Sequence, residues 1–585
     1  MKRTHKNGTL NKEQIGKKVM LAGWVNARRD HGGIIFIEIR DRYGITQVVF
    51  NPEKPFFKEA DKLRNEDVIQ ISGEVVKRPK GMVNENLNTG EIEVVVDKLT
   101  VLNKSKTPKI EVDDRANTND AARMRWRYLD LRKPNMQKKL RNRAKAMKAA
   151  RNYLDKQDFL ELETPMLIRS TPEGARDYVV PSRVHPGKVY SLPQSPQLYK
   201  QLLMVSGFDR YYQFARCLRD EDLRSDRQPE FTQLDLEMSF VEKEDVFEII
   251  EGITKEIWKN VLNQEIKEIP KITYHDSMNK YGNDKPDLRI PWHLQDVTKL
   301  MKNSDLKIFQ KAQCVKMLHV PEQLGSKEVR RYESEAKKVG AKGMAWLKLE
   351  NKELQGPIAK FLKQKEQQEL IKKSKMKEGE FLLFIADRWE NACEILGHLR
   401  VHIYKKYHEL DKSDFKFAWI TDYPLFEYDH DEKKWNPMHH IFSHPTKETI
   451  KHLESNPGKV KSDLYDFILN GYELGSGSIR IHNTKMQQEV MDVIGLSLED
   501  AKDKFGFLLE ALEYGAPPHG GFAIGFDRMM ALMNQTRDIR EVITFPKNKQ
   551  AENPMDGCPT PADKKMLEDY GLQLNAAGKA NLKKH

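Results

Sequence analysis

Short runs of alternating apolar and polar residues dominate the first part of the chain and predict β-strands. The runs are rich in Val and Ile, and Gly, Asn and Pro interrupt them at nearly regular spacing. They cover Val19–Val25, Ile34–Ile39, Ile45–Phe50, Val68–Val76 and Ile92–Leu99. Five short strands within roughly 100 residues are typical of a small closed or half-open barrel, so we expect a barrel domain over residues 1–107.

Helical periodicity replaces this alternation further along the chain. The polar, proline-containing residues 108–134 predict a linker with little structure of its own. Apolar residues at helical spacing then predict a helix over Gln137–Gln157, and a strand over Phe159–Pro165 follows it. Residues 210–240 predict two strands around a charged loop, and Asp245–Val261 predicts a further helix.

The rest of the sequence divides by composition. Residues 288–414 are rich in Lys, alternate between helical and strand patterns and lack the dense polar motifs found on either side, which predicts an inserted α/β domain. The flanking parts, residues 135–287 and 415–554, are therefore expected to form one α+β body. Residues 555–585 are expected to be a C-terminal extension.

The composition excludes two broad classes of protein. Of 585 residues, 39% are apolar and 32% charged, which is enough apolar material for a hydrophobic core and excludes a disordered chain. No run approaches the ~18 apolar residues of a membrane helix, and the start lacks the apolar stretch of a secretory signal. The four scattered cysteines form no CxxC pair, so we expect a cytoplasmic location.

Positive charge is concentrated in the predicted barrel. The chain carries 99 Lys and Arg against 87 Asp and Glu, a net charge of +12. Residues 1–110 hold 21 Lys and Arg against 14 Asp and Glu, which is +7 of that total. Such a field attracts polyanions, so nucleic acid is a candidate partner. A solvated surface balanced for solubility explains the same charge.

The charged loop within residues 210–240 is the first candidate site. Alternation in its second strand places Thr232, Leu234, Leu236 and Met238 on one face and Gln233, Asp235 and Glu237 on the other. In its first strand Arg219 and Glu221 share a face. Arginine pairs polyphosphate oxygens bidentately and carboxylates can hold Mg²⁺, so the hairpin fits a nucleotide site. A surface hairpin rich in salt bridges is the alternative.

Two glycine-bearing segments are further candidates. In His519–Met533 a strand runs into a helix, and Arg528 lies in its opening turn, where anions are favoured. In Tyr472–His482, Glu473 and Arg480 are seven residues apart and point to opposite faces of a regular strand. A common site would need a β-bulge, which we place in the Gly-Ser-Gly-Ser run. A tight strand–helix junction and a flexible polar edge are the alternatives.

These motifs together resemble those of class II aminoacyl-tRNA synthetases. Longer strings narrow the resemblance to the bacterial-type aspartyl-tRNA synthetases, and it spans nearly the whole chain. The strings are Gly23–Asn26, Thr171–Tyr178, Leu192–Lys200, Arg219–Arg224 and, in the predicted insertion, Gly356–Leu362. The resemblance implies an N-terminal OB barrel that binds the anticodon, a catalytic antiparallel sheet with flanking helices, and a homodimer.

The resemblance also implies the reaction and the residues that contact ATP. L-aspartate and ATP form aspartyl-adenylate, which is transferred to the 3′ end of tRNA(Asp). Arg219 would hold the α-phosphate and the substrate carboxyl group, Phe231 would stack on adenine, and Arg528 would grip the γ-phosphate. Glu473 and Asp466 would hold Mg²⁺ with ATP, and Glu473 joins the two arginines as a catalytic residue. The other implied ATP contacts are Asp220, Glu221, Gln228, Gly525, Phe526 and Asp527.

Two further sets of residues are implied. Lys200 and Arg480 would pair with the side-chain carboxylate of aspartate, and His439 would close over it. The ammonium group would lie among Glu173, Gln197 and Asp235, while Arg219 holds the carboxyl group that reacts. On the barrel, the anticodon contacts would be Arg29, His31, Phe36, Gln47 and Gly81.

Several alternatives stay open. His31 and Gly81 resemble the pattern of relatives that charge tRNA(Asn) as well as tRNA(Asp), and a strictly discriminating enzyme is the alternative. A silent RNA-binding relative should have lost Arg219, Glu473 or Arg528, which are all present. An adenylate-forming amide ligase usually lacks the barrel, and an asparaginyl enzyme should lack the insertion.

Overall fold

The computed structural model describes residues 2–171 and 174–582 and divides into two compact units. The first unit contains Met1–Arg141 and Thr544–Thr560, and the second contains Asn142–Ile543 and Pro561–His585. Helix α4 (Pro134–Lys156) begins in the first unit and ends in the second. It begins three residues earlier than predicted, because proline suits the first position of a helix.

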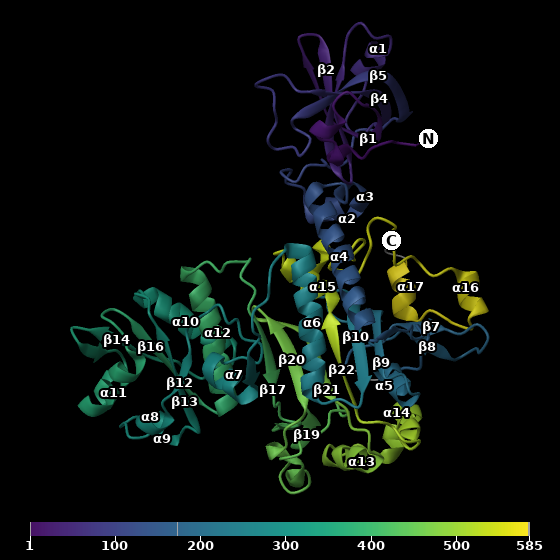
Figure 1. Cartoon of the computed structure of the whole chain (residues 1–585). Helices are drawn as coiled ribbons and strands as arrows, with labels where there is room; N and C mark the ends of the chain where they lie inside the picture. Colours follow the sequence, from purple (N-terminus) through teal and green to yellow (C-terminus); the bar gives the residue numbers. More distant parts are fainter. Residues whose placement is uncertain (1, 172–173, 583–585) are drawn as a thin grey trace. The chain divides into compact units, whose positions relative to one another are not determined.

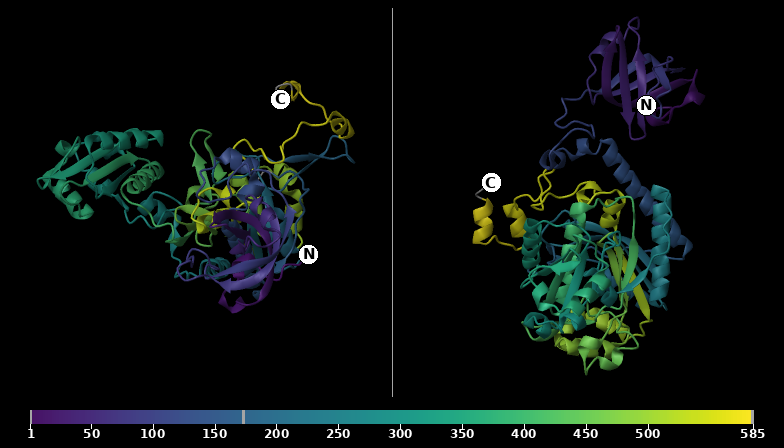
Figure 2. Two further views of the ribbon diagram at one scale, coloured as in Figure 1. Left: turned by 90° about the horizontal axis from the view of Figure 1, so that it is seen from above. Right: turned by 90° about the vertical axis from the view of Figure 1, so that its left-hand side faces the viewer.

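The first unit contains a closed five-stranded barrel, as predicted (Figures 1 and 2). Its strands are β1 (Lys18–His31), β2 (Ile34–Asp41), β3 (Gly44–Phe50), β5 (Ile92–Asn103) and β4 (Val68–Lys77), in that spatial order, with α1 (Phe57–Asp61) between β3 and β4. Ile35, Ile37 and Ile39 of β2 are fully buried in the barrel core, so Phe36 and Glu38 lie on its outer face.

The predicted linker has more structure than expected. It contains α2 (Asp120–Arg125) and α3 (Arg127–Asp130). The Asp130 carboxylate is fully buried and accepts hydrogen bonds from Arg123 at 3.0 Å and Arg127 at 2.7 Å. A buried carboxylate held by two guanidinium groups orders a segment with few apolar residues, which composition alone did not reveal.

An eight-stranded sheet forms the centre of the second unit. Its order is β11 (Lys271–Thr273), β17 (Phe417–Thr421), β20 (Leu464–Leu469), β21 (Tyr472–Ile479), β22 (His519–Gly525), β10 (Glu230–Ser239), β9 (Arg210–Leu218) and β6 (Leu160–Glu161). The end pairs β11–β17 and β6–β9 are parallel and the other pairs are antiparallel. The strand predicted over Phe159–Pro165 is thus only two residues long.

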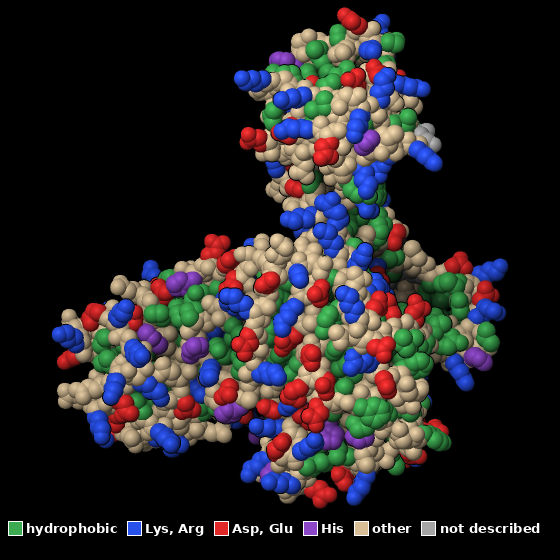
Figure 3. Space-filling model, in the orientation of Figure 1, with side chains coloured by type: hydrophobic (Ala, Val, Ile, Leu, Met, Phe, Trp, Pro, Cys, Tyr) green, Lys and Arg blue, Asp and Glu red, His purple; other side chains and the backbone are tan. Residues whose placement is uncertain are grey.

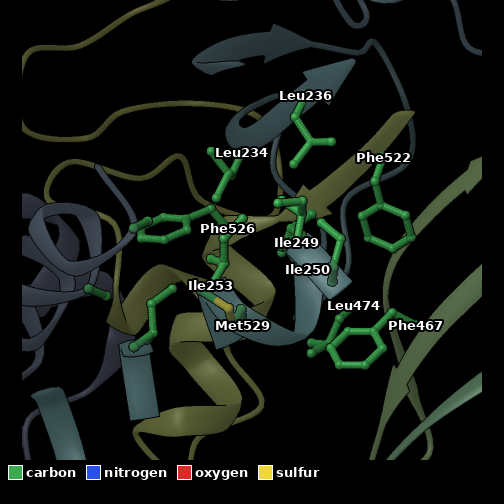
Figure 4. Close-up of a cluster of buried hydrophobic side chains, with 14 of the residues drawn as sticks. Leu234, Leu236, Ile249, Ile250, Ile253, Phe467, Leu474, Phe522, Phe526 and Met529 are labelled. Atoms are coloured by element: carbon green, nitrogen blue, oxygen red, sulfur yellow. The ribbon is translucent and has the colours of Figure 1, made fainter. Parts of the chain in front are cut away.

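Three helices cover one face of this sheet. Apolar residues of α4, α6 (Lys243–Leu262) and α15 (Phe526–Met533) pack against the sheet in one hydrophobic core, part of which Figure 4 shows. Leu234, Leu236 and Met238 of β10 belong to this core, as the alternation predicted. The polar face of β10 therefore lies on the opposite side of the sheet.

Residues 294–387 form a separate five-stranded sheet. Its order is β12 (Leu294–Asp296), β13 (Cys314–Val320), β16 (Phe381–Asp387), β14 (Ala345–Glu350) and β15 (Glu353–Gln355). Both faces are buried: α10 (Ser326–Lys338) and α12 (Trp389–Tyr407) pack on one, and α8 (Thr298–Met301), α9 (Lys307–Lys311) and α11 (Gln364–Ser374) on the other. This is the α/β alternation expected of the insertion.

The remaining elements are short or peripheral. They are β7 (Val179–Pro181), β8 (Val189–Ser191), α5 (Gln197–Val205), α7 (Tyr274–Tyr281), β18 (Phe426–Asp429), β19 (Lys434–Pro437), α13 (Thr484–Val493), α14 (Leu498–Leu512), α16 (Lys564–Asp569) and α17 (Ala576–Leu582). Within the described part of the chain, no helix combines the length and apolar character needed to cross a membrane.

Candidate active site

A β-bulge brings Glu473 and Arg480 to the same face of the sheet, which a common site for the two residues would need. In the pairing of β20 with β21, Phe467 lies opposite Gly475 and Ile468 lies opposite Glu473, so Leu474 is the extra residue. Leu474 is buried in the core (Figure 4), and Glu473 turns to the opposite, polar face. The bulge therefore precedes the Gly-Ser-Gly-Ser run instead of lying within it.

The polar face of the sheet carries a cavity of about 580 Å³. The loop between β9 and β10, the strands β21 and β22 and the start of α15 form its walls. Eight of the residues expected around ATP line it: Arg219, Glu221, Gln228, Phe231, Glu473, Gly525, Asp527 and Arg528. A hollow of this size, with cations and one aromatic ring, fits a nucleotide.

Two arginines line this cavity. Arg219 lies over the ring of Phe231, with its Cζ 5.1 Å from the centroid. Arg528 donates from Nη1 to the Glu473 carbonyl oxygen at 2.7 Å. The Nε atoms of both arginines are buried without a hydrogen-bond partner among the described residues. Unsatisfied buried donors are costly, so this arrangement favours a bound anion.

Four of the residues expected at ATP differ from their predicted placement. Arg219 and Glu221 belong to a loop and not to a strand, because β9 ends at Leu218 and the backbone of Asp220 bonds to Arg176. Asp220 is exposed and does not line the cavity. Phe526 is fully buried in the core (Figure 4), away from the cavity.

Asp527 joins the walls of the cavity to one another. Its carboxylate forms an ion pair with Arg143 of α4 and accepts a hydrogen bond from the backbone N–H of Thr232 at 2.7 Å. Asp527 is only 3% exposed, and its hydrogen bond to Thr232 fixes the start of α15 against β10. The next residue, Arg528, lines the cavity.

A buried ion-pair cluster lies on the same sheet face, one pleat beyond the cavity floor. Asp235 is in register with Ala523 and Ser476, which line the cavity, and Glu237 is in register with Gly521 and Ser478. The Lys200 ammonium contacts Glu237 at 3.1 Å and also pairs with Asp235. Arg480 donates from Nε to Glu237 at 2.9 Å and from Nη1 to Ser478 Oγ at 2.8 Å.

The carboxylates of this cluster hold its cations in place. Burial alone would raise the pKa of Glu237, but Arg480 and Lys200 outweigh it and lower the pKa to about 2. Burial raises the pKa of Asp235, with Lys200 opposing. A Cβ on Gly521 would overlap the Glu237 carboxylate, so glycine is needed there to make room for an ion pair and not for a ligand.

Two histidines and one further carboxylate lie beside the cluster. His440 Nε2 is 3.2 Å from Arg480 Nη1, and burial followed by the charge of Arg480 keeps its pKa well below the usual value. His439 lies 3.9 Å from Asp466, with its ring 5.0 Å from that of Tyr423. His440 is therefore the histidine in contact with Arg480, and His439, which was expected to close over the substrate carboxylate, lies beside Asp466 and Tyr423.

Of the residues expected at the substrate ammonium group, the structure describes Gln197 and Asp235. Glu173 lies outside the described residues. Gln197 opens α5 one turn before Lys200, and its Nε2 is buried without a partner among the described residues. Asp235 is engaged by Lys200. The structure thus brings Gln197, Lys200, Asp235 and Arg480 into one buried region.

The expected anticodon residues lie in two places on the barrel. Arg29 of β1 is paired with Phe36 of β2, and Gln47 of β3 lies opposite Glu38, all on the outer face. His31 ends β1 and is exposed. Gly81 belongs to the loop between β4 and β5, where its φ of +86° suits glycine.

Sequence reasoning missed Glu237 and His440 as members of the site. The alternation of β10 already placed Glu237 on the polar face with Asp235, so the signal was present. Nothing in the sequence distinguished His440 from its neighbour His439, because only the bend of the backbone decides which ring meets Arg480.

Comparison with known proteins identifies the class to which this fold and site belong. Residues 119–549 match the family described as tRNA synthetases class II (D, K and N), and residues 19–102 match the OB-fold nucleic acid binding domain. The chain belongs to the class II tRNA synthetases. It is therefore a ligase that uses ATP to join an amino acid to tRNA, as the resemblance implied.

Relatives and solved structures agree with this family. The Aspartate–tRNA(Asp/Asn) ligase of Halothermothrix orenii is 47% identical over 583 residues, covering 98% of this chain and 99% of the relative. The Aspartate–tRNA ligase of Streptococcus agalactiae is also 47% identical, with 98% and 100% covered. The asparaginyl-tRNA synthetase of Pyrococcus horikoshii shares the fold, with a TM-score of 0.57 at 19% identity, covering 91% of this chain and 95% of that structure.

Proposed function

We propose that this enzyme activates L-aspartate with ATP and transfers it to the 3′ end of tRNA(Asp). One observation carries the proposal: two sets of cations share one face of the sheet. Arg219 and Arg528 line a nucleotide-sized cavity, and Lys200 and Arg480 are buried just beyond its floor. The relatives named aspartate ligases support the same amino acid.

The first step needs positioning and charge stabilisation, and no side-chain nucleophile. A carboxylate oxygen of aspartate forms a bond to the α-phosphorus of ATP, and the bond from that phosphorus to the bridging oxygen breaks, releasing pyrophosphate. Both reactants are anions, so Arg219 between them would lower the barrier, and Arg528 would hold the departing phosphates.

The buried cluster explains why aspartate would be chosen over asparagine. The side-chain carboxylate of aspartate would meet Lys200 and Arg480, whose present partners are Asp235 and Glu237. Asparagine carries no charge there, so it would lack the ion pairs that aspartate gains with Lys200 and Arg480. A site built in this way can discriminate by about 10⁴-fold or more.

Mg²⁺ would bind with ATP at Asp466 and Glu473. Asp466 Oδ1 is buried without a hydrogen-bond partner among the described residues, and Glu473 lines the nucleotide cavity. Mg²⁺ usually binds through one or two carboxylates together with substrate phosphates, so these two side chains fit an ion that arrives with ATP. When bound, Mg²⁺ would neutralise phosphate charge.

The Mg²⁺ requirement should depend on pH. Burial and the charge of Glu473 raise the pKa of Asp466 to about 7. Mg²⁺ binds the ionised carboxylate, so protons compete with it below pH 7. Below pH 7, we expect the Mg²⁺ concentration that gives half-maximal pyrophosphate exchange to increase by at most about tenfold for each unit that the pH is lowered. Above pH 7, this concentration should not change with pH. Asp466→Asn should remove this dependence; an unchanged profile in that variant would exclude Asp466.

The exchange of pyrophosphate into ATP tests the activation step. It should require aspartate and should not occur with asparagine. An exchange that does not depend on aspartate would contradict the proposed substrate, and no exchange at all would favour a silent RNA-binding relative.

Charging both tRNAs tests the range of RNA substrates. His31 ends β1 and Gly81 lies in the loop between β4 and β5, and several relatives bear the name Aspartate–tRNA(Asp/Asn) ligase. We expect purified enzyme to attach aspartate to transcripts of both tRNA(Asp) and tRNA(Asn), with efficiencies within about tenfold. Charging of tRNA(Asp) alone would show a strictly discriminating enzyme.

A homodimer is the proposed assembly. Strand β6 is the edge of the eight-stranded sheet, and its Leu160 is exposed. Exposed apolar side chains accompany it at Met166, Leu167, Val179 and Val189, and Figure 3 shows apolar side chains gathered in this region. An exposed strand edge next to apolar surface is a favourable place for a second copy to pair.

A further inference from the structure

The outer face of β2 carries a continuous series of hydrogen bonds inside the first unit. Phe36, Glu38 and Arg40 point outward in turn along this strand. Phe36 and Arg29, which faces it on β1, are expected anticodon contacts. Arg40 lies four residues further along and is buried under the loop that contains Glu66. The series therefore connects the expected RNA-binding surface with the buried Arg40.

Every link in this series is a direct contact. Arg29 forms an ion pair with Oε1 of Glu38, and Asn26 donates from Nδ2 to Oε2 of Glu38 at 3.0 Å. Arg40 donates to Asn26 Oδ1 at 2.7 Å and to both oxygens of Glu66 at 2.7 and 2.8 Å. Only one orientation of the Asn26 amide satisfies both neighbours, so the series has a fixed direction.

The far end of the series lies in the linker. Arg132, which follows α3, donates to Glu66 Oε2 at 2.7 Å, and its guanidinium group lies 5.0 Å from the ring of Trp24. Glu66 thus accepts from two arginines and is only 5% exposed. Its φ of +70° is uncommon for a residue other than glycine, and such strain persists where the surroundings hold it.

A bulge in β1 completes the arrangement. Asn26 is the extra residue between Val25 and Ala27, opposite Ile39 and Glu38. The backbone of the Glu66 loop bonds to both sides of Val25, at 2.8 Å each. The bulge aims the Asn26 amide at Glu38, and the loop that carries Glu66 holds the bulge in place.

From this geometry we infer that Asn26, Arg40, Glu66 and Arg132 are positioning residues for anticodon recognition. They act through Glu38, whose two oxygens are divided between Asn26 and Arg29. Asn26 fixes one carboxylate oxygen of Glu38. The other oxygen therefore holds the Arg29 guanidinium group in one position on the RNA-binding face. The inference rests on the proposed function, since it assumes that this face reads the anticodon.

The physical argument concerns Arg29, whose side chain is 58% exposed. A long exposed side chain normally samples many rotamers, and ordering it on binding costs free energy. A fixed acceptor at Glu38 orders it before RNA arrives. Loss of a deep member of the series should therefore weaken discrimination between anticodons more than it weakens the chemistry at the active site, which belongs to the second unit.

Arg132→Met tests the inference, and Arg3→Met is its matched control. Both variants remove one guanidinium group from a carboxylate that is 4% exposed: Arg132 from Glu66 at 2.7 Å, and Arg3 from Asp41 at 2.8 Å. Asp41 also ends β2, but its hydrogen bonds go to Arg3 and to backbone N–H groups and not to the series. The two changes should cost similar stability.

The readout is the ratio of kcat/KM for native tRNA(Asp) to that for a transcript with a substituted middle anticodon base. We expect Arg132→Met to lower this ratio at least fivefold through KM, with Arg3→Met within twofold of wild type. Arg132→Lys should recover part of the loss. Glu66→Gln should lower the ratio as well, and it serves if Arg132→Met fails to fold.

A double variant supplies a second test. If the series acts through Arg29, then Arg29→Ala combined with Arg132→Met should lose less than the product of the single effects. Equal ratios for Arg132→Met and Arg3→Met, or fully multiplicative effects in the double variant, would overturn the inference. Aspartate-dependent pyrophosphate exchange, which needs no tRNA, should stay unchanged; its absence in the wild type would instead overturn the proposed function.

Discussion

Replacing Arg219 by alanine is expected to lower the rate of aspartate-dependent pyrophosphate exchange by about 10²–10³-fold. Its guanidinium group lines the nucleotide cavity and lies over the Phe231 ring, and its buried Nε has no hydrogen-bond partner among the described residues. The group is therefore available where charge develops as the carboxylate of aspartate attacks the α-phosphate. Because it acts on the transition state, kcat should fall more than the KM for ATP rises.

Arg216→Ala is the matched control for this change. Arg216 lies on β9 three residues before Arg219, but its side chain is 46% exposed and pairs with Glu230 at 2.8 Å, outside the cavity. Loss of the Arg216 side chain should change the rate of pyrophosphate exchange by less than about threefold, because exposed ion pairs contribute little free energy. Gel filtration should show the same oligomer for both variants. An Arg219→Ala enzyme that retained exchange would remove Arg219 from the proposed mechanism.

Sequence periodicity predicted those strands and helices in which apolar residues recur at regular spacing. The five barrel strands, the two faces of β10 and most of α4 follow from spacing alone, although the predicted start of α4 at Gln137 was three residues late. The bulge between Glu473 and Arg480 was predictable because two charged residues seven apart cannot otherwise share a site. Its position was less predictable, because Leu474 is extruded toward an apolar core that only the tertiary structure supplies.

Other features depend on contacts between segments far apart in sequence. Asp527 pairs with Arg143, which is 384 residues away, and this pairing is what makes it a wall support beside Arg528. Gly521 is glycine because of the Glu237 carboxylate on a neighbouring strand, and not because a ligand approaches it. No local pattern contains these partners.

Arg480→Gln is expected to have the largest effect on amino-acid choice. We expect kcat/KM for aspartate to fall about 10³-fold or more and the preference for aspartate over asparagine to shrink by at least about 100-fold. Glutamine keeps a hydrogen-bonding group but removes the charge that would meet the side-chain carboxylate. Glu237 would still contact Lys200 at 3.1 Å, so the buried carboxylate would not be left without a cation.

Stability must be separated from specificity in this experiment, because breaking a buried ion pair can cost about 3–5 kcal/mol. Arg400→Gln is the control, since Arg400 is also fully buried but donates to the backbone carbonyls of Trp292 and Ile290 in the insertion, at 2.6 and 2.7 Å. It should lower the melting temperature without changing the ratio of aspartate to asparagine activation. If both variants changed that ratio equally, the loss would reflect a loosened fold. If Arg480→Gln alone changed it, the charge of Arg480 would be the feature that selects aspartate.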